Sequence, residues 1–344
     1  MITKFSIPKA PLRKFCEAVK SSRVASTDVF SNAVLVRFSP GEVHFAFRTA
    51  TTRVYYSTRV STVEASGVCS ADVEQFMRAV DVVAENMLLF VHEGRIGFKV
   101  HGTNVLFEAM YPDEDFYDDP TQYAEPKWRI GAYFFNALSE GLKYAGRRGT
   151  YIYCTPERMI VPAFSEFMSI SGRFPRITLN MESARRLVDL FAQSTDKVTV
   201  YRSESMWFFS NGKFGISTLA LANHLPYHAN LNYTSERRMF VEAGKLLPLA
   251  KYLDSPGFSE YVTVAVGTDA KLIIERASHG NVPVEFCVSR SVEDARVPSF
   301  VTILVKALID SLSVFARDIH LSVEGSSLLI SDERKTAVVF GHGR

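Results

Sequence analysis

At 344 residues the chain is too long for one small hydrophobic core, and 47% hydrophobic and 22% charged residues are ordinary for a folded globular protein. The formal net charge of +2, from 39 basic and 37 acidic residues, argues against a protein that holds nucleic acid mainly through its overall charge. The four cysteines (Cys16, Cys69, Cys154, Cys287) lack CxxC spacing, which favours free thiols in a reducing compartment over a disulfide framework.

Along the chain, the apolar spacing repeats one pattern six times: a short strand, an amphipathic helix, then alternating strands. In the first copy Leu12, Phe15, Cys16 and Val19 recur at i, i+3, i+4 and i+7, which predicts a helix with one buried face. The helices are expected within residues 9–20, 70–85, 132–146, 181–194, 238–253 and 299–316. The repeated pattern therefore predicts six β-α-β-β-β modules.

Period-two alternation carries the strand predictions. Val262, Val264 and Val266 alternate with polar or small neighbours, and Leu272 and Ile274 have the same spacing although Ile273 lies between them. Two stretches without periodicity separate pairs of modules: the acidic, proline-containing residues 113–127, and a weaker break at 230–237. We expect three α+β domains, each with two helices packed against antiparallel sheets, over residues 1–122, 123–233 and 234–344.

An enzyme is the first alternative, and the sequence gives it little support. There is no HExxH, P-loop, GxSxG, or GxGxxG between a strand and a helix. His224 and His228 have i, i+4 spacing, but Pro226 between them argues against a helix, and the acidic cluster at 113–119 is typical of a solvated linker. We expect no catalytic residue, no metal and no cofactor.

The N-terminus has no apolar signal-peptide core, and the most apolar stretch, residues 300–315, is interrupted by Lys306 and Asp310 and is too short to span a bilayer. We expect a cytoplasmic protein without membrane contact.

The six-module pattern resembles the bacterial DNA polymerase III β sliding clamp family, in which three domains of two such modules follow one another. The resemblance extends to particular segments. VLFEAMYPDEDFYD has the strand and acidic run of that family's first domain, KFGISTLALANHLPYHANL has the strand, loop and aromatic-proline element that ends its second, and TAVVFGHGR has its terminal apolar strand and basic tail. The chain is similar to a divergent member of the family, one that a virus could encode.

The resemblance implies a ring of two chains joined head to tail, with the helices lining a hole through which double-stranded DNA passes. Enclosure retains DNA without strong phosphate contacts, so a mildly basic lining suffices. We expect the DNA-facing residues to be Arg13, Lys14, Lys20, Arg23, Lys143, Arg147, Arg148, Arg185, Arg186, Lys245, Lys251 and Lys306. Any one of these could equally be a solvated helix residue, and the second helix is acidic rather than basic.

The resemblance also implies a groove that binds a short apolar peptide from a DNA polymerase, a clamp loader, or other replication and repair proteins. Carried over position by position, its residues would be Phe164, Phe167, Met168, Leu231, Val338, Phe340 and His342. Two departures predict a peptide preference that differs from the family's. Ser165-Glu166-Phe167-Met168 stands where the family commonly has a Gly-His-Arg-Leu type run, and Phe340-Gly341 where it has Met-Pro.

For the homodimer seam, the resemblance implies that the edge strand 104–110 pairs with an edge of the third domain. Leu106 and Phe107 are the expected apolar anchors on one side, with Leu249 and Leu253 opposite. The second alternative is a monomeric processivity factor of the same fold, which binds DNA by charge along one face and closes no ring.

Overall fold

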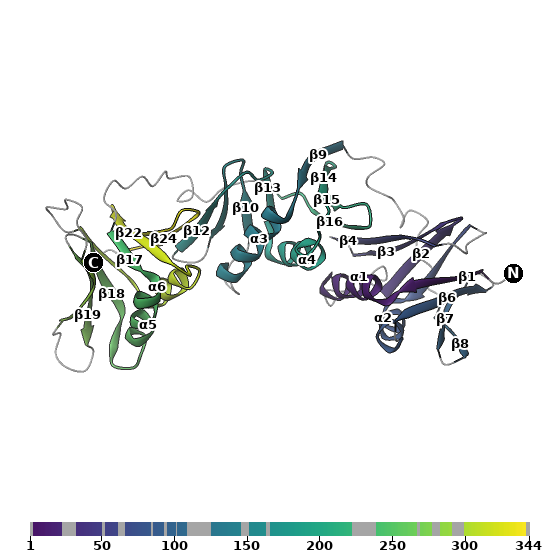
Figure 1. The fold of residues 1–344 in the computed structure, drawn as a ribbon, viewed down its shortest axis with the longest axis horizontal. Coiled ribbons are helices and arrows are strands. Elements are labelled where there is room, and N and C mark those ends of the chain that lie inside the picture. Colours follow the sequence, from purple (N-terminus) through teal and green to yellow (C-terminus); the bar gives the residue numbers. More distant parts are fainter. Residues whose placement is uncertain are drawn as a thin grey trace. The chain divides into compact units, whose positions relative to one another are not determined.

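The computed structural model describes residues 3–22, 32–49, 52–60, 66–83, 85–92, 95–100, 102–108, 125–145, 151–162, 166–221, 239–266, 269–276, 283–290 and 299–341. Within these ranges the chain forms six consecutive modules, each of one strand, one helix and three strands (Figure 1). The expected α+β class with antiparallel sheets is confirmed.

The first two modules contain β1 (Thr3–Pro8), α1 (Lys9–Ser22), β2 (Ala33–Ser39), β3 (Glu42–Arg48), β4 (Arg53–Arg59), and then β5 (Gly67–Asp72), α2 (Val73–Val82), β6 (Asn86–His92), β7 (Arg95–Val100) and β8 (Thr103–Leu106). The third and fourth contain β9 (Glu125–Ile130), α3 (Ala132–Ala145), β10 (Tyr151–Cys154), β11 (Arg158–Pro162), β12 (Glu166–Ser171), and then β13 (Ile177–Asn180), α4 (Met181–Phe191), β14 (Val198–Arg202), β15 (Met206–Ser210) and β16 (Phe214–Leu219). The last two contain β17 (Met239–Glu242), α5 (Ala243–Leu253), β18 (Phe258–Val266), β19 (Asp269–Arg276), β20 (Pro283–Arg290), and then β21 (Ser299–Leu304), α6 (Val305–Leu312), β22 (Asp318–Glu324), β23 (Ser327–Ser331) and β24 (Lys335–Phe340).

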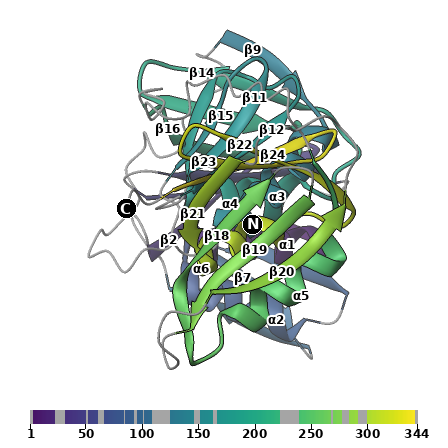
Figure 2. The ribbon, with the colours of Figure 1, turned by 90° about the vertical axis from the view of Figure 1, so that its left-hand side faces the viewer.

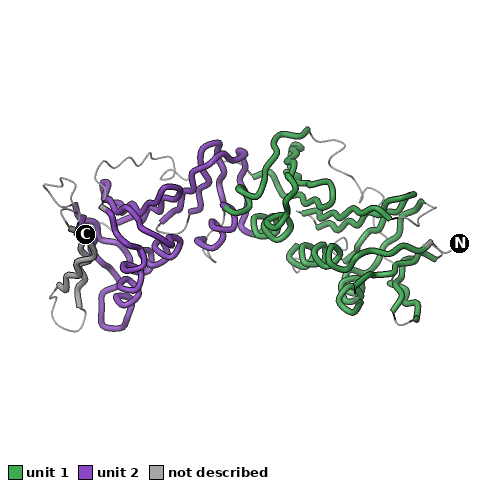
Figure 3. Tube along the Cα trace, viewed as in Figure 1, with its two compact units in different colours: residues 1–136, 182–221 green, residues 137–181, 222–344 purple. Residues whose placement is uncertain are grey.

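The chain divides into two compact units (Figure 3). Unit 1 comprises residues 1–136 and 182–221, and unit 2 comprises residues 137–181 and 222–344. Each unit holds one eight-stranded and one four-stranded sheet. The division passes through α3 and directly after Met181, the first residue of α4, so the three expected domain boundaries stay a prediction.

Unit 1 contains an eight-stranded sheet of order β5-β2-β3-β4-β16-β15-β14-β9 and a four-stranded sheet of order β1-β6-β7-β8. Unit 2 repeats the arrangement with β13-β10-β11-β12-β24-β23-β22-β17 and β20-β19-β18-β21, and the latter sheet faces the viewer in Figure 2. At the centre of each eight-stranded sheet, the last strands of two modules pair antiparallel: β4 with β16, and β12 with β24. We call these two lines of pairing the β4–β16 seam and the β12–β24 seam.

Modules are linked in pairs because the first strand of each module pairs with a strand of the other module's sheet. β1 pairs with β6 while β5 pairs with β2, and the same exchange joins β9 to β14, β13 to β10, β17 to β22, and β21 to β18. The first strand of each module thus extends the sheet of its partner module, and this exchange joins the six modules into three pairs.

The helices cover one face of each sheet, and the core lies between them. In unit 1, Phe15 of α1 packs against Phe45 and Tyr56 at ring-centroid distances of 6.1 and 6.5 Å, and Phe76 of α2 packs against Phe45 at 5.8 Å. In unit 2 the apolar faces of α5 and α6 share one cluster with the inner faces of the strands beside them. These contacts confirm the amphipathic stripes read from the sequence.

One expected helix is shorter than its apolar run. Residues 299–304 form strand β21, and α6 begins only at Val305. β21 pairs with β18 so that Val262 lies opposite Ile303 and Val264 opposite Val301, which buries Val301 and Ile303 and leaves Phe300 56% exposed. Because pairing with β18 buries these apolar side chains, the run forms a strand where the sequence predicts a helix. β5 and β17 likewise occupy the beginnings of the expected helices 70–85 and 238–253.

Candidate functional sites

On α1 the expected cations are at the surface but not equally available. Arg13 is exposed and pairs with Glu17 at 3.2 Å, and Lys20 is exposed. Lys14 is half-buried, with its Nζ atom 5.3 Å from the centre of the Phe214 ring. Burial, and then the nearby charge of Lys213, lower the pKa of the Lys14 ammonium. α1 therefore presents a basic surface that Glu17 partly offsets.

Arg186 on α4 is not a surface cation, which corrects its expected DNA-facing role. Its side chain is 2% exposed. The guanidinium donates to the Ser21 carbonyl oxygen from Nε at 3.1 Å and from Nη2 at 2.9 Å, and to Thr52 Oγ1 from Nη1 at 2.6 Å. Nη2 also pairs with Glu182. Arg186 thus joins α4 to the end of α1 and to the residue before β4.

Of the remaining α4 charges, Arg185, Glu182 and Asp189 are exposed. With Arg186 withdrawn into the interior, the exposed face of α4 carries two carboxylates beside one guanidinium. Asp189 is exposed as a residue but its carboxyl is partly desolvated; this desolvation and the charge of Glu17 raise the pKa of the carboxyl, while Arg185 opposes the shift. α4 is therefore a weaker DNA-facing candidate than its sequence indicated.

The cations of the other helices are exposed where the structure describes them: Lys143 on α3, Lys245 and Lys251 on α5, and Lys306 on α6. Lys245 pairs with Glu242 at 2.8 Å. Arg23, Arg147 and Arg148 lie outside the described residues. The acidic character of α2 is retained, since Glu74 and Asp81 are exposed and Arg78 pairs with Glu74 at 3.5 Å.

Three of the residues expected to line the peptide groove lie at the β12–β24 seam. Phe167 lies opposite Val338 in the register, and both belong to an apolar cluster with Ile160 and Leu329. Phe340 is half-buried against this cluster, with its ring centroid 5.9 Å from that of Phe167. The structure therefore brings Phe167, Val338 and Phe340 together, although only Phe340 of the three is more than marginally accessible.

Met168 is a core residue, which corrects its expected place in the groove. It is fully buried, and as the neighbour of Phe167 in β12 its side chain points to the opposite face of the sheet. Phe164, Leu231 and His342 lie outside the described residues.

A buried polar cluster beside this seam was not anticipated. Glu166, 3% exposed, accepts a 2.6 Å hydrogen bond from Ser311 Oγ on α6. Burial, and then the negative charge of Glu166, raise the pKa of the Tyr144 hydroxyl on α3 well above its ordinary value. The only sequence signal was a carboxylate within an otherwise apolar strand run, and periodicity alone does not reveal its partners.

Of the two neighbouring residues expected at the dimer interface, Leu106 is exposed and Phe107 is buried. Leu106 and Val105 are 43% and 38% exposed on β8, an edge strand. Phe107 is 2% exposed and stacks on Phe98 at 5.3 Å. Its amide donates to the Ile96 carbonyl, which continues the register of β7 and β8, so its side chain lies on the sheet face opposite to that of Leu106. Leu106 remains a candidate anchor, and Phe107 is a core side chain.

The expected anchors on the opposite side lie on α5 and not on an edge strand. Leu253 is 1% exposed within the unit 2 core, and Leu249 is partly buried against the same core. The edge strands of the four-stranded sheet in unit 2 are β20 and β21.

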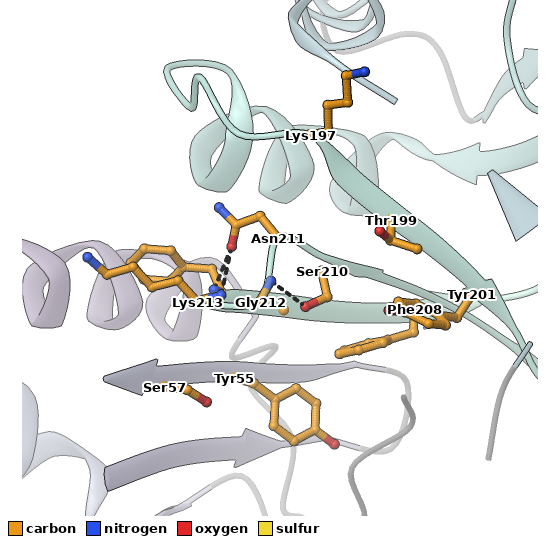
Figure 4. A pocket seen from close by; sticks show the side chains of 12 residues that line it. Tyr55, Ser57, Lys197, Thr199, Tyr201, Phe208, Ser210, Asn211, Gly212 and Lys213 are labelled. Atoms are coloured by element: carbon orange, nitrogen blue, oxygen red, sulfur yellow. Dashed lines mark hydrogen bonds between the residues drawn. The ribbon is translucent and has the colours of Figure 1, made fainter. Parts of the chain in front are cut away.

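Unit 1 also has one cavity that no sequence pattern indicates. It measures about 390 Å³ and is lined by residues of β4, β14, β15, β16 and the turn from β15 to β16 (Figure 4). Its aromatic residues come from separate modules, so only the β4–β16 pairing brings them together.

No group of three or more His, Cys, Asp or Glu side chains in the described ranges could hold a metal ion. No helix among those residues is long and apolar enough to cross a membrane.

The whole chain is similar to solved bacterial sliding clamps. It matches a DNA polymerase sliding clamp from Pseudomonas aeruginosa with a TM-score of 0.78 at 14% identity, covering 99% of this chain and 100% of that one. A Helicobacter pylori β clamp matches with a TM-score of 0.77 at 11% identity over 99% and 100% of the two chains. A sliding clamp from Bartonella birtlesii, solved bound to griselimycin, matches with a TM-score of 0.77 at 13% identity over the full length of both. No protein-family model and no curated protein matches the sequence. The chain thus has the sliding-clamp fold.

Proposed function

We propose that this chain, which has the fold of the bacterial DNA polymerase III β clamps, is itself a divergent DNA sliding clamp. It would encircle duplex DNA as a head-to-tail homodimer and tether a DNA polymerase and other replication or repair proteins without catalysing a reaction. The observation that carries the proposal is the agreement of the fold over the full length of both chains. Its place of action would be the cytoplasm in which the DNA lies.

The pattern of strand pairing supports closure by a second copy. In both eight-stranded sheets, two four-stranded halves join through the last strands of their modules. Two last strands are left over, β8 and β20, and each is the edge of a four-stranded sheet. Pairing β8 of one copy with β20 of another would complete two further eight-stranded sheets. The exposed Val105 and Leu106 on β8 would then be covered.

The charge distribution is compatible with retention by enclosure. Exposed cations on α1, α3, α5 and α6 offer phosphate contacts, while α2 and α4 carry exposed carboxylates. A ring does not need a strong affinity for phosphate, since leaving closed DNA requires opening of the ring. A protein that bound DNA only by charge would need a more uniformly basic surface.

For partner binding, the β12–β24 seam is the proposed groove, with Phe340 at its surface and Phe167 and Val338 beneath it. Apolar peptide side chains would pack against Phe340. A clamp loader would be a further partner. The proposed ring is closed by two β8–β20 pairings between the copies, and one of them must open before DNA can enter.

The solution mass tests the proposal. We expect sedimentation equilibrium to give a dimer, about twice the 38.5 kDa chain. Val105→Glu should shift the protein toward the monomer, because it places a charge on the β8 edge. Val68→Glu is the matched control, since Val68 is an exposed valine, 57% accessible, on β5, another edge strand. A monomer at micromolar concentration, with steeply salt-dependent binding to linear DNA, would favour the charge-based monomeric factor.

A further inference from the structure

The eight-stranded sheet of unit 1 has one face turned away from the helices, which we call its outer face. Tyr56 of β4 is fully buried and packs against Phe15 of α1, so every second residue of β4, counted from Tyr55, points to the outer face. Phe45 of β3 packs against the same ring, and Val36 of β2 lies opposite Phe45 in the register. The neighbours of these two residues therefore point outward as well. Four of the outward side chains, which we call the arginine face, are those of Arg37, Arg48, Arg53 and Arg59.

Positive charge on this sheet is a property of unit 1 and not of the fold. Its six central strands, β2, β3, β4, β16, β15 and β14, contain five arginines and a single carboxylate, Glu42. The fifth arginine, Arg202, lies over the Trp207 ring. The equivalent strands of unit 2, β10, β11, β12, β24, β23 and β22, contain two cations and three carboxylates. Both sheets have the same order of strands, so the fold itself does not require the arginines, whereas an anionic partner would.

Two of these arginines lie directly opposite each other. Arg48 and Arg53 are register partners at the hairpin between β3 and β4, and both are half-buried. Like charges directly opposite each other destabilise an antiparallel pair of strands. Glu42 lies at the other end of β3, opposite Arg59, and pairs with His44 at 3.2 Å. An anion bound over Arg48 and Arg53 would therefore relieve a repulsion that Glu42 is too distant to offset.

The arginine face is long enough to contact several phosphates. Arg53 and Arg59 are six residues apart on one strand, which corresponds to about 20 Å. Double-stranded DNA carries one negative charge per about 1.7 Å of its axis and would present about twelve phosphates over that length. Guanidinium groups suit this partner because they form paired hydrogen bonds with phosphate oxygens.

We propose that the arginine face binds the phosphate backbone of double-stranded DNA, as a contact separate from the helices. The choice of DNA as the partner rests on the proposed function, but the contact needs no ring closure. In a ring it would hold DNA outside the hole. In a monomer it would be the charged face on which the alternative processivity factor depends.

Two observations favour duplex DNA over an acidic protein or single-stranded DNA. A protein partner usually buries an exposed apolar centre, but Leu35, Ala46 and Tyr55 in the middle of this face are only 3%, 1% and 8% exposed. Single-stranded DNA is bound by stacking on accessible rings, and Tyr55 is the only Phe, Tyr or Trp that points outward from β2, β3 and β4. The face thus offers charge without an apolar or stacking surface, which matches contacts to the backbone of a duplex.

Fluorescence anisotropy with a labelled linear duplex of about twelve base pairs, measured at several salt concentrations, tests the site. We expect saturable binding by the wild type, with an affinity that falls as salt rises. Arg48→Gln combined with Arg53→Gln should weaken binding at least tenfold at low salt and reduce the slope of log affinity against log salt by about 2. Arg37→Gln combined with Arg59→Gln should do the same. This second pair is exposed, so it tests the site even if the half-buried first pair impairs folding.

Arg158→Gln combined with Arg176→Gln is the matched control, because it removes two cations from unit 2. It should change neither the affinity nor the slope. Arg13→Gln combined with Lys20→Gln removes two exposed cations from α1. Loss of binding confined to this α1 pair would place the duplex on the helices and overturn the proposal.

Other results would also overturn the proposal. These are no saturable binding of the duplex by the wild type, unchanged binding by the exposed arginine pair, or an equal loss of binding in the unit 2 control. Tighter binding of an oligothymidine or a polyglutamate of equal charge would assign the face to single-stranded DNA or to an acidic protein instead. Solution mass, measured on the same samples, reports on ring closure separately. A monomer that binds the duplex through the arginine face would contradict the ring alone.

Discussion

Arg186 Nη1 donates a 2.6 Å hydrogen bond to Thr52 Oγ1, and this bond connects the fourth module to the first. Thr52 is itself 2% exposed, so both groups are removed from water. The same guanidinium donates twice to the Ser21 carbonyl at the end of α1. A cation that the sequence places among DNA-facing residues is therefore part of the contact between modules.

Arg186→Ala should lower the free energy of unfolding by about 2–3 kcal/mol, because it leaves the buried Thr52 hydroxyl and Ser21 carbonyl without their charged donor. Arg185→Ala is the matched control, since the adjacent side chain is exposed and should change stability by less than about 0.5 kcal/mol. Urea unfolding measures both. Equal effects of the two variants would contradict the structural role assigned to Arg186.

Asp189→Asn should stabilise the protein at neutral pH. Burial and the charge of Glu17 raise the pKa of Asp189 above its ordinary 3.8, so the folded state binds this proton more tightly than the unfolded state does. Ionisation of Asp189 therefore opposes folding above the raised pKa, and the effect vanishes below 3.8, where both states are protonated. The gain should be less than about 1 kcal/mol because the group is exposed.

Thermal melting of wild type and Asp189→Asn at neutral pH and near pH 3 measures this difference. The variant's advantage should be present at the higher pH and absent at the lower. An advantage that is the same at both values would show that the substitution acts through packing and not through charge.

Phe107→Ala and Leu106→Ala should have opposite signatures although the residues are adjacent. Phe107 packs against Phe98 and Phe76, so its truncation should cost about 3–5 kcal/mol of unfolding free energy. Leu106 is 43% exposed, and its truncation should leave unfolding of the monomer nearly unchanged while weakening self-association. Chemical unfolding and sedimentation separate the effects. Weakened association in Phe107→Ala without loss of stability would reverse the assignment.

The buried cysteines should resist alkylation in the folded protein. Burial raises the pKa of Cys16 and of Cys69 to about 12 and that of Cys154 further, so the reactive thiolate is scarce at neutral pH. Site-resolved mass spectrometry after iodoacetamide treatment should find these three unmodified until urea is added. Rapid labelling of Cys16 without denaturant would contradict its burial.

Much of the architecture could be read from the sequence, because amphipathic periodicity is a local property. The stripe of Leu12, Phe15 and Val19 is buried as expected, and the sixfold β-α-β-β-β order is confirmed. The apolar run before α6 was misread because a strand and a helix can both bury such a run, and only its pairing with β18 decides between them.

Which side chains reach the surface was decided by the tertiary structure. Arg186, Met168 and Phe107 looked like site residues because their types suit DNA, peptide or dimer contacts, yet all three are buried. Their burial follows from groups distant in sequence: Thr52 and Ser21 for Arg186, the inner sheet face for Met168, and Phe98 for Phe107. The cavity lined by Tyr55 and Phe208 likewise depends on the pairing of β4 with β16. Local spacing determined the modules, while non-local strand pairing, which no local pattern encodes, decided which of their residues reach the surface.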